Sequence, residues 1–371
     1  MYLQELSLAT YRNISSVALT FRPGVTVFVG PNGQGKTNLV EAIEYAATQR
    51  SHRVTSDQAL VMTGHAGARI RAVFRAAHRR SQVDIQVRAT GSNQVFLNEN
   101  AVQRKSLIGQ FPLVFFSPSD LSLVRGDPSE RRRYLDELVL KLRPSSFMIF
   151  HEYERIVRQR NALLRHLSRV GGRTTDALHD WDVQLIDAGS QILHLRQQVL
   201  TSLGPDVAAS YEAVARRDQN IELDLAATVP VQPDLAETKA VFGRILAENR
   251  AREVERGSTL YGPHRDDLVL TVDGLVVRQH ASHGESWSFA LALRLGEAEA
   301  LRRRSRVGDP ILILDDVFAE LDRARRTALA ERVIGFEQVF ITAAVPQELP
   351  EIQDERRISV HAGEFEEETH G

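Results

Sequence analysis

The chain has 371 residues, of which 43% are hydrophobic and 25% charged, and its formal net charge is −2. This length suffices for one large domain or two ordinary ones, and the composition is typical of a soluble globular protein. The lack of cysteine excludes disulfides, thiolate metal sites and cysteine nucleophiles, and neither an apolar run of roughly 20 residues nor a secretory start is found, so we expect a cytoplasmic protein without membrane contact.

Short strands dominate the first part of the chain. Apolar and polar residues alternate over 2–9 and 15–22, which predicts half-buried strands, and the apolar run 25–29 predicts a buried strand. Apolar residues at helical spacing predict a helix over 36–47. Further strands are expected at 70–74, 83–87, 95–97 and 112–116, and a helix at 129–142.

Residues 144–257 follow a helical pattern. Apolar residues recur at steps of three or four between Gly and Pro breaks such as Gly171-Gly172, which predicts an antiparallel helical arm. The helical stretches are expected at 147–167, 178–199 and 235–255. About 25 helical residues reach only ~37 Å, so the arm is short.

Strands and helices alternate again after the arm. Asp273-Gly274 predicts a hairpin turn between strands at 268–272 and 275–277, and the acidic tail 364–368 is expected to fray. The other expected elements are helices at 284–304 and 323–334, a buried strand at 311–314 and a last core strand at 338–342. We therefore divide the chain into an N-terminal head part (1–143), a helical arm (144–257) and a C-terminal head part (258–371).

The clearest motif is a glycine-rich loop that matches G-x-x-x-x-G-K-T in full. It consists of Gly30, Pro31, Asn32, Gly33, Gln34, Gly35, Lys36 and Thr37. Its glycines let backbone N–H groups wrap around phosphates, and the following helix adds its positive end. Lys36 would neutralise the β- and γ-phosphates of ATP, and Thr37 would bind Mg²⁺. The alternative, a chance glycine-rich turn, is disfavoured by the strand before the loop and the helix after it.

Two carboxylates supply the second half of such a site. Asp315 and Asp316 follow the apolar run 311–314. Because ligands of α/β sheets bind at the carboxyl ends of the strands, Asp315 is the candidate that holds Mg²⁺. Asp316 is the candidate catalytic base, which orients or deprotonates the attacking water. Without the glycine-rich loop, the same pattern would fit an ordinary strand-to-turn junction.

The spacing of the two halves indicates a large insertion, since 279 residues separate Lys36 from Asp315. Before that strand, Ser282, Gly284 and Glu285 open a helix, where a hydroxyl, backbone N–H groups and the helix dipole form a second anion site. Lys36 already serves the chain's own nucleotide, so this turn would cap a nucleotide held by another subunit. The alternative is that Ser282 is an ordinary helix N-cap.

In order along nearly the whole chain, these motifs resemble those of the RecF family of SMC-like ABC ATPases. The resemblance implies an α/β fold, an ABC-type P-loop ATPase head with a mixed sheet flanked by helices, which carries an inserted short α-helical arm. The matching segments are Tyr11-Arg12-Asn13, the loop from Gly30 to Asn38, residues 116–121, 126–136 and 262–267, and the stretch from Ser282 to Asp322.

The resemblance also implies a function in recombinational repair and replication-gap processing. Such a protein would form an ATP-dependent homodimer, bind double-stranded DNA and its junctions with single strands, and hydrolyse ATP slowly in a DNA-dependent way. With RecR and RecO it would help to load recombinase at gaps. The alternatives are an ATP-gated DNA scaffold with little hydrolysis and another ABC-type nucleotide-binding subunit, such as that of a transporter.

Carried over by position, the resemblance implies roles for individual residues. Lys36 and Asp316 would be catalytic, and Thr37 and Asp315 would hold Mg²⁺. The nucleotide-binding residues would be Arg12, Gly30, Pro31, Asn32, Gly33, Gln34, Gly35, Lys36, Thr37, Asn38, Ser282, Gly284, Glu285 and Asp322.

Some of these residues would contact the partner subunit or its nucleotide, and one would contact the adenosine. Ser282 and Gly284 would act in trans, Asp322 would close the dimer junction, and Arg12 would lie near the adenosine. Three positions depart from the family pattern: Glu285 stands where Gln is common, Trp287 replaces a basic residue, and Ala343-Ala344 stands where a His or Thr often senses the γ-phosphate. The departures bear on the rate of hydrolysis more than on ATP binding.

Two further features are polar without forming a motif. The loop 262–267 is interpreted as a structured connection in which Arg265 pairs with Asp266 or Asp267, with a role near the nucleotide as the alternative. Candidate DNA contacts are the arginines at 131–133 and 302–304 with Arg306, and Arg53, although such runs are more often solvated helix faces or ion-pair partners.

Overall fold

The computed structural model describes residues 1–77, 79–170, 176–305 and 307–368. Contacts divide the chain into two compact units. We call residues 1–121, 206–218 and those from 282 onward the sheet unit, and residues 122–205 and 219–281 the helical unit. The predicted boundaries at 143/144 and 257/258 stay a prediction.

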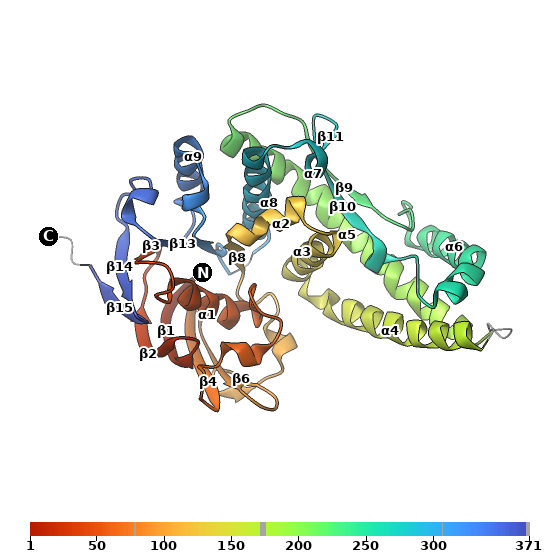
Figure 1. Cartoon of the computed structure of the whole chain (residues 1–371), viewed down its shortest axis with the longest axis horizontal. Helices are drawn as coiled ribbons and strands as arrows, with labels where there is room; N and C mark the ends of the chain where they lie inside the picture. The colour runs from red at the N-terminus through yellow and green to blue at the C-terminus, as the bar shows by residue number, and fades with distance from the viewer. Residues whose placement is uncertain (78, 171–175, 306, 369–371) are drawn as a thin grey trace. The chain divides into compact units, whose positions relative to one another are not determined.

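The first sheet of the sheet unit has six strands in the order β15-β14-β3-β13-β12-β8 (Figure 1). All neighbouring pairs are parallel except β14 and β15. β12 and β13 are buried along their whole length, which explains their apolar runs at 311–314 and 339–341. The parallel sheet confirms the α/β prediction. The strands are β3 (Gly24–Val29), β8 (Leu113–Phe116), β12 (Ile311–Asp315), β13 (Gln338–Ala343), β14 (Arg356–His361) and β15 (Glu364–Glu367).

Two predictions about the end of the chain are wrong. The strand at 338–342 is not the last core strand, because β14 pairs in parallel with β3, and residues 364–367 are not frayed, because β15 pairs with β14. Val360 is buried, and the ring of Phe365 meets that of Phe28 edge-on at 6.5 Å between centroids. The packing of these apolar side chains fixes the tail to the sheet.

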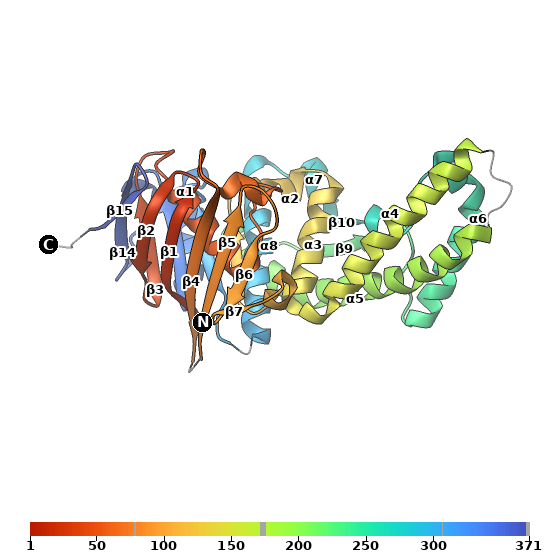
Figure 2. The ribbon, with the colours of Figure 1, turned by 90° about the horizontal axis from the view of Figure 1, so that it is seen from below.

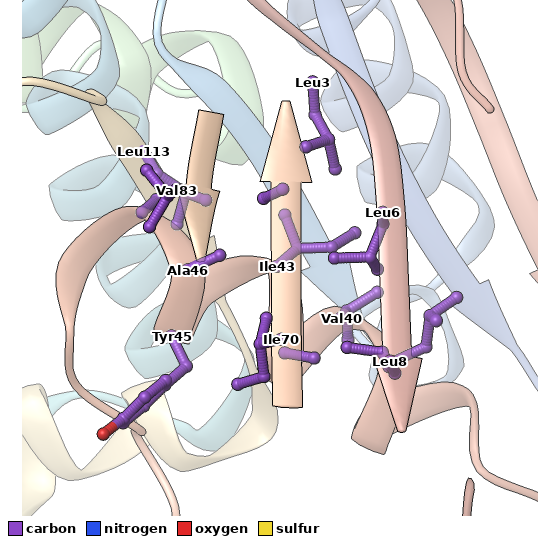
Figure 3. Packing of buried hydrophobic residues seen from close by; sticks show 14 of the residues in the cluster. Leu3, Leu6, Leu8, Val40, Ile43, Tyr45, Ala46, Ile70, Val83 and Leu113 are labelled. Atoms are coloured by element: carbon purple, nitrogen blue, oxygen red, sulfur yellow. The ribbon is translucent and has the colours of Figure 1, made fainter. Parts of the chain in front are cut away.

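Helix α1 (Lys36–Thr48) contacts both this sheet and a second, antiparallel sheet with the strand order β2-β1-β4-β5-β6-β7. Val40 and Ile43 of α1 pack with Leu6 and Ile70 of the second sheet (Figure 3). Because both faces of α1 are covered, most of its residues are apolar. The second sheet consists of β1 (Tyr2–Tyr11), β2 (Ile14–Thr20), β4 (Gly67–Ala76), β5 (Arg79–Arg88), β6 (Gln94–Leu97) and β7 (Asn100–Ala101).

Two further helices of the sheet unit confirm the predictions at 284–304 and 323–334. α8 (His283–Arg304) packs on β8, and α9 (Arg323–Val333) leads from β12 towards β13. Gly296 of α8 allows a close approach, since a Cβ there would lie 2.6 Å from Cγ2 of Val207.

The helical unit contains long helices, as predicted, together with a three-stranded antiparallel sheet. β9 (Ile221–Ala226), which pairs with β10, was not predicted, although its apolar and charged residues alternate. The helix α5 (His179–Ala215), whose residues from Asp206 onward belong to the sheet unit, continues past the predicted end and contains Pro205. The predicted break at Gly171-Gly172 lies outside the described residues. The other elements are α2 (Leu121–Arg125), α3 (Pro128–Leu142), α4 (Phe147–Arg169), α6 (Leu235–Arg256), β10 (Asp267–Val272), β11 (Leu275–Val276) and α7 (Val277–His280), seen in Figures 1 and 2.

Over the ranges that the structure describes, no helix is both long and apolar enough to cross a membrane.

The polar loop 262–267 lies in the helical unit, and the pairing predicted for Arg265 is wrong. Arg265 Nε donates to the Thr259 carbonyl at 3.1 Å. Asp267 instead accepts hydrogen bonds from Arg131 at 2.7 and 2.8 Å. Arg196 also pairs with Asp266 at 3.4 Å, so the arginines that pair with the loop come from segments far away in the sequence.

His264 in this loop is held as a neutral imidazole. Its Nδ1 lies 2.8 Å from Tyr153 Oη and its Nε2 lies 3.1 Å from the Thr259 carbonyl, so a proton on Nε2 satisfies both ring nitrogens. Burial is the main cause that lowers the pKa of His264 to about 4, and the neighbouring Arg265 acts in the same direction.

We expect the helical unit to lose stability when the pH falls from 7 to 5. The unfolded chain protonates His264 below about pH 6.5, whereas the folded chain resists until about pH 4, so roughly 2 kcal/mol of unfolding free energy is lost over this interval. Urea unfolding followed by circular dichroism at both pH values measures the loss. His264→Gln should be less sensitive to pH, and an equal loss in both proteins would contradict the assignment.

Candidate nucleotide-binding site

The glycine-rich loop connects β3 to α1, as predicted. Gly33 and Gly35 have φ angles of 82° and 117°, a region that side chains disfavour. Gly30 has a different reason to be glycine: an added Cβ would lie 2.2 Å from the carbonyl oxygen of Val360 in β14. The backbone conformation of the loop and its packing therefore both require these glycines.

The ammonium group of Lys36 lies within the loop. Nζ donates to the carbonyl oxygens of Gly30 and Pro31, the latter at 3.0 Å, and lies 3.5 Å from Asn32 Oδ1. Burial lowers the pKa of Lys36, while the negative charges of Asp316 and other nearby carboxylates oppose this shift. The ammonium group is therefore hydrogen-bonded to the loop and interacts electrostatically with nearby carboxylates.

The structure brings Thr37 and Asp315 together, although they lie far apart in the sequence. Thr37 Oγ1 donates to Asp315 Oδ1 at 3.0 Å, and Thr342 Oγ1 of the adjacent strand donates to the same oxygen at 2.7 Å. A hydroxyl and a carboxylate side by side provide the oxygen ligands that Mg²⁺ prefers, with room for water ligands in its octahedral shell. These residues therefore fit the predicted metal site.

Asp316 follows on from this pair in a strained conformation. Its φ of 56° lies in the left-handed region, and its backbone N–H donates to Thr342 Oγ1 at 2.9 Å. Burial is the largest cause that raises the pKa of Asp316, followed by the charges of Asp315 and Glu348, while Lys36 opposes the shift. A carboxylate with a raised pKa is a stronger base, which suits the role expected for Asp316.

Ser282 is the N-cap of α8 and forms a capping box with Glu285. Ser282 Oγ accepts from the Glu285 N–H at 3.3 Å, and the Glu285 carboxylate accepts from the Ser282 N–H at 2.9 Å. Arg217 Nη1 also donates to Glu285 at 3.2 Å. The unusual carboxylate at this position is thus bonded to backbone and to an arginine, and the hydrogen bond from the Ser282 N–H is the main cause that lowers its pKa.

Arg325, which the sequence analysis missed, joins Asp322 to this turn. Asp322 caps α9 by accepting from the Arg325 N–H at 2.9 Å, and the Arg325 guanidinium pairs with the Asp322 carboxylate. Arg325 Nε also donates to Ser288 Oγ at 2.9 Å, and a Cβ on Gly284 would lie 3.2 Å from its Nη2. The three-residue spacing from a capping Asp was a possible signal, but the contact with Gly284 was not readable from sequence.

Arg12 is held by a second residue that was not predicted, Glu41. The guanidinium donates to the fully buried Glu41 carboxylate at 3.0 and 2.7 Å. Nearby, Asn38 Nδ2 donates to Asn13 Oδ1 at 2.7 Å, which links the first turn of α1 to the β1–β2 turn. The location of Arg12 near an adenosine stays a prediction.

Most of the candidate DNA-contact arginines donate to acidic, amide or backbone oxygens, whereas Arg304 is exposed. Arg131 pairs with Asp267, Arg133 with Glu130, and Arg303 with Asp206, while Arg132 donates to the Asp266 carbonyl, Arg302 pairs with Asp309, and Arg53 donates to Asn38. Arg306 lies outside the described residues. The clusters therefore behave largely as ion-pair partners.

In the described part of the chain, no group of three or more His, Asp or Glu side chains could hold a metal ion by itself.

Comparison with known proteins extends this picture over the whole chain. The family model described as "RecF/RecN/SMC N terminal domain" matches residues 2–365. The chain is 46% identical over 385 residues to the DNA replication and repair protein RecF of Clavibacter sepedonicus, covering 98% of the chain and 94% of that relative. It is 43% identical over 376 residues to the protein of the same name from Streptomyces avermitilis, covering 99% and 100%.

Solved structures agree with the sequence comparison. The structure of the recombination mediator protein RecF with ATP in the RecFOR pathway has a TM-score of 0.91 at 27% identity, covering 99% of this chain and 98% of that chain. An SMC head bound to the C-terminal winged-helix domain of ScpA has a TM-score of 0.57 at 15% identity, which shows a shared fold alone.

Proposed function

Because the chain belongs to the RecF family of SMC-like ABC ATPases, we propose that it is a cytoplasmic DNA replication and repair protein that binds ATP with Mg²⁺. The observation that carries the proposal is the convergence of Lys36, Thr37 and Asp315 at one end of the first sheet. A nucleotide-binding loop, a hydroxyl and a carboxylate from distant segments meet there. The RecF structure with ATP, which covers nearly the whole chain, supports the same role here.

In this proposal the residues divide the work of ATP hydrolysis. The backbone N–H groups of the loop and the Lys36 ammonium hold the phosphates, and Thr37 with Asp315 hold the cation. Bound Mg²⁺ would neutralise charge on the phosphate oxygens. Asp316 accepts a proton from the attacking water on its carboxylate. Thr342 Oγ1 positions Asp316 by accepting a hydrogen bond from the Asp316 backbone N–H. Because Ala343-Ala344 offers no polar side chain to the γ-phosphate, we expect hydrolysis to be slow.

We further propose that ATP closes a homodimer through Ser282, Gly284 and Asp322. The first turn of α8 and the N-terminus of α9 are joined by Arg325, so a partner's phosphates would meet one connected surface. The Glu285 carboxylate accepts hydrogen bonds from the Ser282 N–H and from Arg217. These bonds lower the free-energy cost of placing the negative charge of Glu285 beside a phosphate.

Ser282→Arg should abolish ATP-dependent dimerisation while ATP still binds to the monomer, because the large side chain would fill the surface that receives the partner's nucleotide. Static light scattering with and without ATP measures the change. Asp234→Arg is a matched control, since Asp234 is also an N-cap but opens α6 in the helical unit. An ATP-dependent dimer in Ser282→Arg would exclude this role for the turn.

We propose that the protein binds duplex DNA and junctions of duplex with single strands, and that it acts with RecR and RecO to load recombinase at gaps. Family membership and the RecFOR pathway of the structural relative support this role. A net charge of −2 requires local basic surface, and contacts to the DNA backbone depend steeply on salt.

Gel-shift titrations with duplex, gapped and single-stranded DNA test the DNA proposal. We expect ATP to tighten binding to duplex and gapped DNA, and added salt to weaken it with a linear dependence of log affinity on log salt concentration. Equal binding to all three DNAs, or none with ATP present, would contradict the proposal. DNA-stimulated phosphate release distinguishes an ATPase from an ATP-gated scaffold.

A further inference from the structure

The hairpin formed by β14 and β15 contacts the glycine-rich loop at its turn. The Ala362 N–H donates to Gln34 Oε1 at 2.7 Å, and the Gly363 N–H donates to the Gln34 carbonyl at 2.9 Å. One strand of the same hairpin places the Val360 carbonyl against Gly30. The end of the chain therefore meets the loop at two points, 328 residues from Gln34 in the case of Ala362.

The turn is closely fitted between the glycine-rich loop and the β1–β2 turn. Ala362 and Gly363 have φ angles of 50° and 84°, as in a two-residue hairpin turn of the type that requires two left-handed residues. A Cβ on Gly363 would lie 2.9 Å from the Asn13 carbonyl oxygen, and a Cβ on Gly35 would lie 3.2 Å from the Asn13 side chain. Asn13 thus lies against both the hairpin turn and the glycine-rich loop. A displacement of the hairpin turn would therefore also displace the glycine-rich loop.

The hairpin is itself firmly attached to the sheet unit. β14 pairs in parallel with β3, the strand that leads into the loop, and Ser359 lies in register with Val29. Ile358 and Val360 are buried in the core, so the turn is carried on a fixed support.

We infer that the β14–β15 hairpin holds the glycine-rich loop in its phosphate-binding conformation, with Gly363 and Gln34 as positioning residues. Gln34 stands between Gly33 and Gly35, and glycine is the residue type with the greatest backbone freedom. Two hydrogen bonds to Gln34 fix the middle of the loop, so less conformational freedom is lost when phosphates bind. The Gln34 side-chain oxygen is used for this support rather than for the nucleotide. The inference rests on the proposed ATP binding of the loop.

Gly363→Ala tests the inference, with Gly91→Ala as the matched control. Both glycines occupy hairpin turns at nearly the same φ, 84° and 88°, but a Cβ on Gly91, between β5 and β6, meets nothing within 4 Å. Both substitutions should lower the melting temperature through backbone strain. Only Gly363→Ala should raise the dissociation constant for ATP, by about tenfold. The reason is that Gly363, unlike Gly91, lies in the hairpin turn that is hydrogen-bonded to the glycine-rich loop.

Equilibrium titration with a fluorescent ATP analogue, in full-length protein checked by circular dichroism, gives the affinities. Equal ATP affinity in Gly363→Ala and Gly91→Ala would overturn the inference. If Gly363→Ala does not fold, Gln34→Ala decides, since it removes only the bond to Ala362: affinity weakened several-fold supports the inference, and wild-type affinity overturns it. Failure of the wild-type protein to bind ATP would instead refute the proposed function.

Discussion

Lys36→Ala is expected to raise the dissociation constant for ATP about 100-fold, equivalent to roughly 3 kcal/mol of binding free energy. The ammonium lies inside the glycine-rich loop, bonded to the carbonyls of Gly30 and Pro31, where the phosphates would enter. Its loss removes charge-assisted hydrogen bonds to the phosphates and leaves Asp315 and Asp316 uncompensated. Isothermal titration calorimetry at fixed salt and Mg²⁺ concentration measures the affinity.

Lys105→Ala is the control for this measurement, because Lys105 is an exposed lysine elsewhere in the sheet unit. It should bind ATP like the wild-type protein. If Lys36→Ala binds ATP within a factor of about three of the wild type, less than 1 kcal/mol, the loop is not the phosphate site. The result would then also remove the basis of the proposed dimer.

Asp316→Asn should lower kcat for ATP hydrolysis by about 10²- to 10³-fold, since it removes a general base that accepts the proton of the attacking water. ATP affinity should not fall, because the amide removes a negative charge near the phosphates. Asp315→Asn is a contrasting variant: its carboxylate is bonded to Thr37, so its loss should raise the Mg²⁺ concentration needed for activity. Phosphate release with and without DNA measures both.

The pH profile separates a base from a merely structural carboxylate. Burial and the neighbouring carboxylates raise the pKa of Asp316, so the base is lost at a higher pH than an ordinary Asp would allow. As the pH falls through that raised pKa, kcat of the wild-type protein should fall with it. The residual activity of Asp316→Asn should lack this decline. A wild-type activity that stays constant down to the ordinary pKa range of Asp would contradict the role.

Much of the candidate site could be predicted because its parts are local. The glycine-rich loop, its preceding strand and its following helix are contiguous. One short segment of the sequence therefore determines both the backbone conformation and the chemistry of the loop. The strand that ends at Asp315 could be predicted as well, because it is a contiguous apolar run. Pairings between distant side chains were less accessible: Glu41 as the partner of Arg12, Arg325 beside Gly284, and Arg131 as the partner of Asp267 all went unpredicted.

The errors in the fold have a related cause. The residues 364–367 were expected to fray because their charge dominates the local pattern, whereas the packing of Phe365 on Phe28 and the pairing of β15 with β14 depend on where the sheet lies. β9 was overlooked between two helical stretches for a similar reason. Local charge or helix-like context is a weak guide where a strand gains its stability from a partner strand.

The sequence alone therefore determined the family, the glycine-rich loop between a strand and a helix, and the two carboxylates predicted to act with it, because each lies in a contiguous segment whose backbone and chemistry are set by neighbouring residues. Only the tertiary structure decided that Thr37 and Asp315 share a hydrogen bond, that Arg325 joins Asp322 to Ser288 of α8, and that the turn between β14 and β15 donates hydrogen bonds to Gln34. Those contacts arise when sheets and helices bury their apolar faces against one another, and that packing brings together atoms that sequence spacing leaves unrelated.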